Sequence, residues 1–199
     1  MAELERLNID QLAELERLLT RQRAPVVPRF QPPASDEALA AVESYLGTSL
    51  PDELREWWRW HDGIDGKGDE MVQASIGPIF FALSTTDAVK NSRELRAGAE
   101  EDAPEDPDSL WASSWIAIGS QGRVACECSI PANAPVPVLD VDYHKAAYPG
   151  AVVCHSLGKM VRWWIEALES GAWRYDQERN RWERIYELIP PERDQAGLV

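Results

Sequence analysis

Long apolar runs are missing from this 199-residue sequence. A helix needs about 18 to 20 consecutive apolar residues to cross a bilayer, and no stretch of the sequence approaches that length. The opening residues, MAELERLNID, also lack the basic start and the apolar core of a secretory signal. We therefore expect a cytoplasmic protein that does not associate with membranes.

Cysteine and histidine are scarce, with three of each. The odd cysteine count argues against a secreted disulfide scaffold. Cys126 and Cys128 alternate on a predicted strand, so they point the same way and are expected to be small buried hydrophobes. His144, Cys154 and His155 leave a metal cluster open as an alternative, but they lack the i,i+4 and C-x-x-C spacings that metals use. We expect no metal and no cofactor.

Basic residues are outnumbered: 20 Lys and Arg stand against 34 Asp and Glu, which gives a formal net charge of −14. A negative potential over the surface repels phosphate backbones, so the sequence argues against nucleic acid and against anionic membranes as partners. A basic protein partner fits the charge better. The alternative is that the acidic residues serve solubility alone.

Catalytic motifs are also absent: the sequence holds no G-x-S-x-G, phosphate loop, G-x-G-x-x-G or H-E-x-x-H. His61 stands at the end of a predicted helix, where the helix dipole favours a protonated imidazole, so a capping role is the simpler interpretation than catalysis. The sequence predicts a protein that is not an enzyme.

Helical patterns dominate the first third of the chain. Leucines at helical spacing predict an amphipathic helix over 9–19, and the four prolines that follow it predict an extended connector. Ser35 is a good N-cap for a second helix that Gly47 ends. A third helix starts near Pro51 and carries Trp57 and Trp58 on one face, so the second and third helices form a hairpin.

Strand patterns follow after two acidic segments, at 62–70 and 100–108, that are expected to be loops. A short exposed helix is expected over 87–96, capped by Thr86 or Asp87. Apolar runs at 115–120, 123–130 and 136–142 predict strands with tight connections, which favour an antiparallel sheet. A helix capped by Ser156 and ended by Gly171 should cover one face of the sheet, and a final hairpin should place Trp173, Tyr175 and Trp182 on one side.

Together these elements predict an α+β fold, an antiparallel sheet with an N-terminal helical hairpin and a C-terminal helix packed on the sheet. We expect residues 1–29 to form an N-terminal helix with a Pro-rich connector, residues 30–190 to form the α+β domain, and residues 191–199 to be a frayed tail.

Several of these features together resemble the SUKH (Smi/Knr-like) superfamily. The shared pattern is an acidic capped helix, an L-G turn, a Leu-Pro and an aromatic helix ending in Asp-Gly, here Ser35, Leu46, Gly47, Leu50, Pro51, Trp58, Asp62 and Gly63. The strand Trp-Ile-Ala-Ile-Gly-Ser and the helix after Ser156 are similar to later parts of the family. The resemblance implies a non-catalytic binding domain, because members are chiefly immunity proteins against bacterial toxins, often nucleases, or regulators of fungal cell-wall assembly.

Acidic side chains near aromatic ones are the candidate partner-binding residues. Trp60 lies off the apolar face of its helix, so we expect it to be exposed and to act as an anchor. The full candidate set is Trp60, Asp62, Asp65, Asp69, Glu70, Glu127, Asp140 and Asp142. An immunity protein that covers a basic toxin surface is the leading hypothesis. An intracellular adaptor with another protein client is the alternative, and a hydrolase would require His61 or His155 to meet a carboxylate in a pocket.

Overall fold

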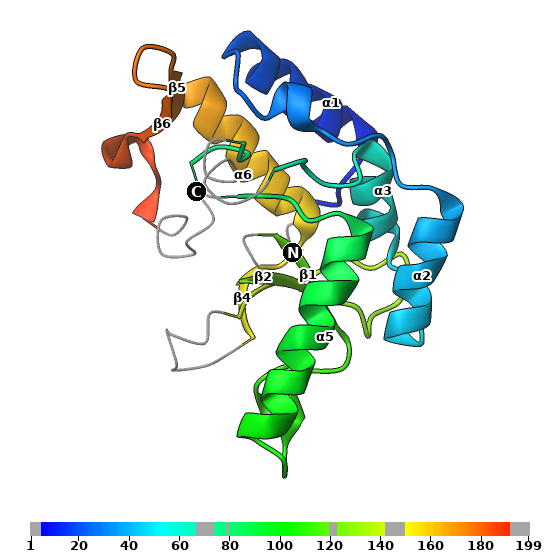
Figure 1. Cartoon of the computed structure of the whole chain (residues 1–199). Helices are drawn as coiled ribbons and strands as arrows, with labels where there is room; N and C mark the ends of the chain where they lie inside the picture. The colour runs from blue at the N-terminus through cyan, green and yellow to red at the C-terminus, as the bar shows by residue number, and fades with distance from the viewer. Residues whose placement is uncertain (1–4, 67–73, 79, 120–122, 142–149, 192–199) are drawn as a thin grey trace.

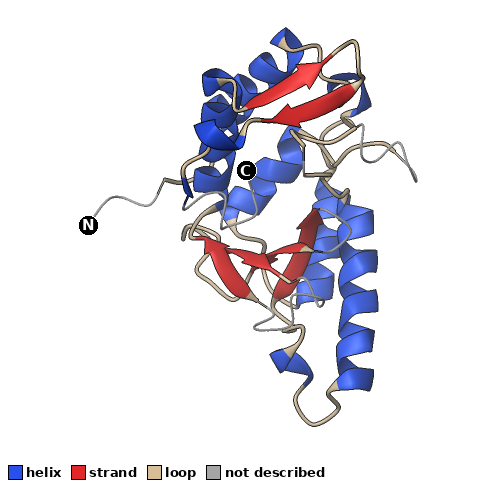
Figure 2. Ribbon diagram, turned by 90° about the vertical axis from the view of Figure 1, so that its left-hand side faces the viewer, coloured by secondary structure: helices blue, strands red, loops and turns tan. Residues whose placement is uncertain are grey.

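The computed structural model describes residues 5–66, 74–78, 80–119, 123–141 and 150–191. Helices flank an antiparallel sheet, and a separate two-stranded hairpin lies at the end of the molecule opposite the tip of α5 (Thr85–Asp102) (Figures 1 and 2). The expected α+β fold is confirmed.

In the described chain, four strands form the sheet in the order β1 (Trp115–Gly119), β2 (Val124–Glu127), β3 (Val138–Asp140) and β4 (Ala151–Cys154). All neighbours are antiparallel, with Trp115 opposite Glu127 and Val124 opposite Asp140. The three predicted strands are confirmed within shorter bounds, whereas β4 was not predicted. Every residue of β1 is buried, because helices and the neighbouring strand enclose it.

The N-terminal helical hairpin is also confirmed, as α2 (Asp36–Leu46) and α3 (Asp52–Trp60). The Ser35 side chain accepts a backbone N–H of the first turn of α2, and Gly47 ends the helix at a φ of 68°, where a side chain would be strained. An ion pair between Arg59 of α3 and Asp36 of α2 links the two helices at 2.8 Å.

Helix α5 differs from the expectation. It starts after Ser84, whose side chain caps it, and it continues to Asp102, so the predicted loop over 100–108 begins as helix. Packing explains the extension: Ala99 is fully buried, and the hydroxyl of Ser92 accepts the backbone N–H of Ala117 in β1. Tertiary contacts thus hold a helix whose local sequence is acidic. A short 3-10 turn, η2 (Pro107–Ser109), follows.

Helices α1 (Ile9–Arg21) and α6 (Leu157–Ser170) pack along each other, with α6 between α1 and the sheet (Figure 1). Both were predicted. Leu12, Leu15 and Leu19 of α1 are fully buried and belong to the same core as the residues of α6. Helix α1 is therefore part of the packed core of the chain.

Tryptophan side chains fill the centre of the fold. The rings of Trp57, Phe80 and Trp164 contact one another at centroid distances from 4.8 to 6.2 Å. The indole N–H of Trp58 donates to the carbonyl of Leu83 at 3.1 Å. Eight of the nine Trp residues are less than 10% exposed, so these aromatics build the core and not a recognition surface.

The C-terminal hairpin consists of β5 (Trp173–Asp176) and β6 (Arg181–Arg184), as predicted. Tyr175 lies opposite Trp182, and their rings meet edge to face at 5.4 Å. A 3-10 turn, η5 (Tyr186–Leu188), follows β6. Apart from residue 191, the tail predicted to fray lies outside the described residues.

Candidate functional site

A buried carboxylate, Glu53, joins three separate segments beneath the surface. The side chain is fully buried and accepts the backbone N–H groups of Leu7, Val136 and Gly158. These donors belong to the segment before α1, the segment before β3 and the first turn of α6. Because donors surround it, Glu53 holds the scaffold together and is not available to a ligand. The pattern of apolar and polar residues in the sequence did not predict this structural role of Glu53.

Trp60 is not exposed, so the prediction of an exposed anchor was wrong. Its side chain is 8% exposed, and its indole N–H donates to the carboxylate of Glu16 at 2.9 Å. The ring also contacts Phe30 and Trp57. The physical reason is that α1 and the connector after it cover this flank of α3, a contact that helix periodicity within α3 could not reveal.

His61 is the C-cap residue of α3, as expected. Its ring stacks on Phe30 at 4.4 Å, Nδ1 lies 2.9 Å from the carbonyl of Gln31, and Nε2 lies 3.3 Å from the carboxylate of Glu16. The imidazole does meet a carboxylate, but both ring nitrogens are engaged and one face is stacked. This arrangement favours a structural role for His61 over general-base chemistry.

Among the predicted acidic residues near α3, Asp62 has a structural role. Its carboxylate accepts the backbone N–H of Thr85 at 2.6 Å and the hydroxyl of the same residue at 3.2 Å, which anchors the first turn of α5. Asp65 is exposed. The other candidates in this group, Asp69 and Glu70, lie outside the described residues, as do Asp142 and His144.

Glu127 and Asp140 lie on neighbouring strands but not side by side. Asp140 pairs with Val124 at the far end of β2, three residues from Glu127, or about 10 Å along a strand. Glu127 accepts the indole N–H of Trp115 at 3.0 Å and the backbone N–H of Ser129 at 2.6 Å. Burial alone would raise the pKa of Glu127. Hydrogen bonds from Ser129, Ser114 and the indole of Trp115 outweigh burial and lower the pKa.

A cluster of exposed carboxylates covers the C-terminal end of α5 and the turn after it. We call it the acidic tip, and it consists of Glu100, Glu101, Asp102, Glu105, Asp106 and Asp108. Arg96 forms ion pairs with Glu100 and Asp108. The last turn of α5 carries no basic residue, although carboxylates at this negative end of the helix dipole are unfavourable. Figure 1 shows this end of α5 projecting beyond the sheet.

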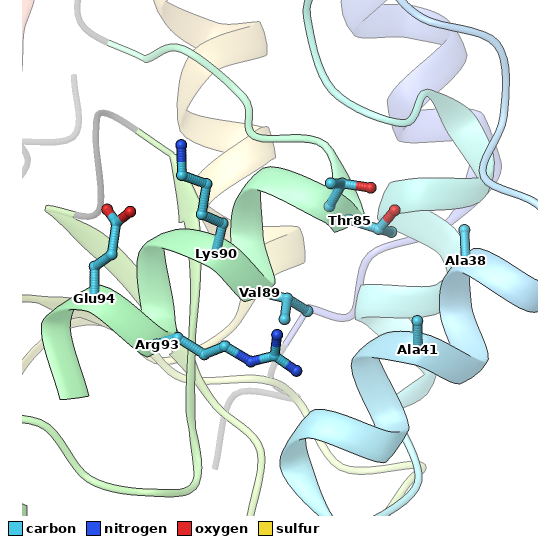
Figure 3. Close-up of a pocket in the computed structure, with 8 residues that line it drawn as sticks. Ala38, Ala41, Thr85, Val89, Lys90, Arg93 and Glu94 are labelled. Carbon is cyan, nitrogen blue, oxygen red and sulfur yellow. The ribbon is translucent and has the colours of Figure 1, made fainter. Parts of the chain in front are cut away.

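An open hollow of about 510 Å³ lies between α2 and α5 (Figure 3). We call it the α2–α5 groove, and its lining residues are Ala38, Ala41, Thr85, Thr86, Val89, Lys90, Arg93 and Glu94. Figure 3 shows Arg93 reaching from α5 toward α2, with Lys90 and Glu94 projecting from another flank of α5. The sequence interpretation missed the groove, although the alanines of α2 are a signal for it, because their short side chains leave space beside the helix.

A second hollow, of about 560 Å³, lies between α3 and the segment before α1. Three arginines line it, and each forms an ion pair with a carboxylate: Arg6 with Asp52, Arg55 with Glu43 and Arg59 with Asp36. The positive charge of this hollow is thus already balanced within the protein.

The cysteines are buried, as expected for Cys126 and Cys128. Burial raises the pKa of each thiol, including that of Cys154, so the reactive thiolate is disfavoured. His155 is exposed. Among the described residues, no three His, Cys, Asp or Glu side chains come together in a way that could hold a metal ion.

Among the residues that the structure describes, no helix is long and apolar enough to span a membrane.

Comparison with known proteins places the chain in a family. A search of curated proteins finds no match. The sequence model of the SMI1 / KNR4 family (SUKH-1) matches residues 33–137, which is more than half of the chain and includes α2, α3, α5, the acidic tip and the first two strands. The chain therefore belongs to the SMI1 / KNR4 (SUKH-1) family.

Proposed function

We propose that the chain is a non-catalytic immunity protein that neutralises a cognate bacterial toxin by covering the toxin's basic surface with the acidic tip. Family membership supports a protein-binding domain of immunity or cell-wall regulator type. Within that range, a net charge of −14 favours a basic partner such as the active surface of a nuclease.

The acidic tip carries the proposal. Its six carboxylates are all exposed, and Arg96 pairs with two of them, Glu100 and Asp108. The excess negative charge repels itself, and three of the carboxylates stand in the last turn of α5, where the helix dipole disfavours negative charge. Such an arrangement costs stability, which is typical of residues retained for binding. Asp65, Asp69, Glu70, Glu127, Asp140 and Asp142 remain predicted contact residues, with Asp65 the exposed one among those described.

Co-expression with a toxin gene found beside this gene is the direct test of the proposal. We expect the wild-type chain to restore growth, and growth arrest despite abundant protein would contradict the proposal. An adaptor for another client, the alternative function, predicts no toxin gene beside this one.

A pair of charge-reversed variants tests the role of the acidic tip. Glu101→Lys, Asp102→Lys and Glu105→Lys together should slow association with the toxin and flatten its dependence on salt. The matched control changes three exposed glutamates elsewhere, Glu169→Lys, Glu178→Lys and Glu187→Lys, and has the same net charge. Equal effects of the two triple variants would show that total charge matters and the tip does not.

A further inference from the structure

The α2–α5 groove has an apolar floor. Ala38 and Ala41 of α2 face Val89 of α5 across the hollow (Figure 3). The alanine side chains end at Cβ, so the surface of α2 stays low beside α5 and leaves the hollow of about 510 Å³ open. A space of that size accommodates a few side chains of a binding partner.

Two cations of the groove have no carboxylate partner in the described structure. None of the ion pairs among the described residues includes Lys90 or Arg93. Arg93 instead lies over the ring of Tyr45, with the guanidinium carbon 5.6 Å from the ring centre, which directs it toward α2. In the hollow between α3 and the segment before α1, by contrast, all three arginines are paired within the protein.

We propose that the α2–α5 groove binds an acidic amphipathic helix of a partner protein. Apolar side chains of that helix would cover Ala38, Ala41 and Val89, and a carboxylate on its flank would pair with Arg93 and, at the rim, with Lys90. Helices dock into grooves of this kind through apolar anchors, and complementary charges fix their register. The partner chemistry is opposite in charge to that proposed for the acidic tip, so the inference stands whether or not the partner is a toxin.

A pair of peptides tests the proposal on the full chain. One is a fluorescein-labelled helical peptide with leucines along one face and glutamates along its flanks, and the other has every glutamate replaced by lysine. Because the protein carries a net charge of −14, overall electrostatics favour the lysine peptide, so a preference for the glutamate peptide must come from local cations. Fluorescence anisotropy at about 50 mM salt, where surface charges are weakly screened, gives both affinities.

Variants then locate the binding. We expect Arg93→Glu to lower the affinity for the glutamate peptide by at least about tenfold without lowering the affinity for the lysine peptide. Ala41→Phe, at an exposed position, should fill the hollow and weaken the same peptide without any change of charge. Arg181→Glu, in the distant hairpin, is the matched control and should change its affinity less than about twofold. Circular dichroism and urea midpoints verify that each variant is folded.

Two results would overturn the proposal. One is a dissociation constant of the glutamate peptide above about 1 mM. The other is binding that neither Arg93→Glu nor Ala41→Phe weakens. Either result leaves the proposed role of the acidic tip in place, because that role is measured separately with the toxin.

Discussion

The carboxylate of Glu53 accepts the backbone N–H of Gly158 at 3.2 Å, across 105 positions of the sequence. This hydrogen bond places a negative charge at the N-terminal end of α6, where the helix dipole favours it. The same carboxylate accepts two more backbone donors, so one side chain sets the positions of α3, α6 and the segment before α1 relative to one another.

Replacing Glu53 by glutamine should destabilise the protein strongly. Glu53→Gln removes the charge and turns an NH₂ group toward backbone donors, and we expect a loss of about 3 kcal/mol of unfolding free energy. Urea unfolding measures it. Glu56→Gln, an exposed change in the same helix, is the control and should stay within about 0.5 kcal/mol of wild type. Similar losses in both variants would mean that Glu53 is not a structural centre.

Two glycine substitutions should have opposite signs. A Cβ at Gly158 would collide with the backbone of Arg6 and Leu7, whereas a Cβ at Gly98 in α5 would meet no atom within 4 Å. Gly158→Ala should therefore lower the melting temperature by displacing the segment before α1. Gly98→Ala should raise the unfolding free energy by about 0.4 to 1 kcal/mol, because alanine favours the helix. Thermal unfolding of both variants checks this pair, and a stabilised Gly158→Ala would contradict the packing described.

Local cues explain which elements could be predicted from the sequence. Ser35, Gly47, Ser156 and Gly171 act on the residues next to them, so the limits of α2 and α6 follow from the sequence alone. The strand β4 is no shorter than β2 and β3, but its four residues are all apolar although the first two are exposed, so its sequence lacks the alternation that marks a half-buried strand.

The features of the candidate sites that the sequence did not reveal depend on contacts far apart in the chain. Trp60 is buried because α1 and the connector cover it, and Glu16 of α1, which accepts its indole N–H, is 44 positions away. The pattern of apolar and polar residues around Glu53 does not distinguish a buried glutamate from an exposed one. The groove requires α2 and α5 to lie side by side, which no single helix pattern can predict. The acidic segment 100–108 was predicted to be a loop, but α5 carries its first three residues.

Trp60 and Glu16 should be energetically coupled. A double-mutant cycle of Trp60→Phe and Glu16→Gln, measured by urea unfolding, should give a coupling free energy of about 0.5 to 1.5 kcal/mol, the range of a typical hydrogen bond within a protein. The partner affinity of Trp60→Phe should equal that of wild type, since the ring is buried. A coupling near zero would mean that the hydrogen bond is unimportant for stability.

Glu127 should contribute a pH-dependent part of stability. Its pKa is lower in the folded chain than its ordinary value, so the ionised form stabilises the fold above the unfolded pKa of about 4.3. That contribution is lost as the pH falls through the lower, folded pKa. Urea midpoints of wild type and Glu127→Gln should therefore differ most at neutral pH and converge below about pH 4. A difference that stays constant with pH would contradict this assignment.

Neutralising the end of α5 should stabilise the free protein. Glu101→Gln with Asp102→Asn removes two carboxylates from the negative end of the helix dipole and from mutual repulsion. The melting temperature should rise while toxin affinity falls. Asp10→Asn, in the first turn of α1 where a carboxylate is favourable, is the control and should lower the melting temperature. A lower melting temperature for the α5 variant would show that these carboxylates support the fold.

The position of α1 also governs when folding can finish during synthesis. The side chain of Gln22, just after α1, donates to the carbonyl of Trp173 and accepts the backbone N–H of Tyr175, so it bonds with residues more than 150 positions later. The leucines of α1 pack against α6, which follows α1 only after a long stretch of sequence. Until the hairpin leaves the ribosome, the apolar face of the amphipathic helix α1 thus lacks its packing partners in a nascent chain. Its exposure to aggregation therefore lasts until Trp173 and Tyr175 have been synthesised.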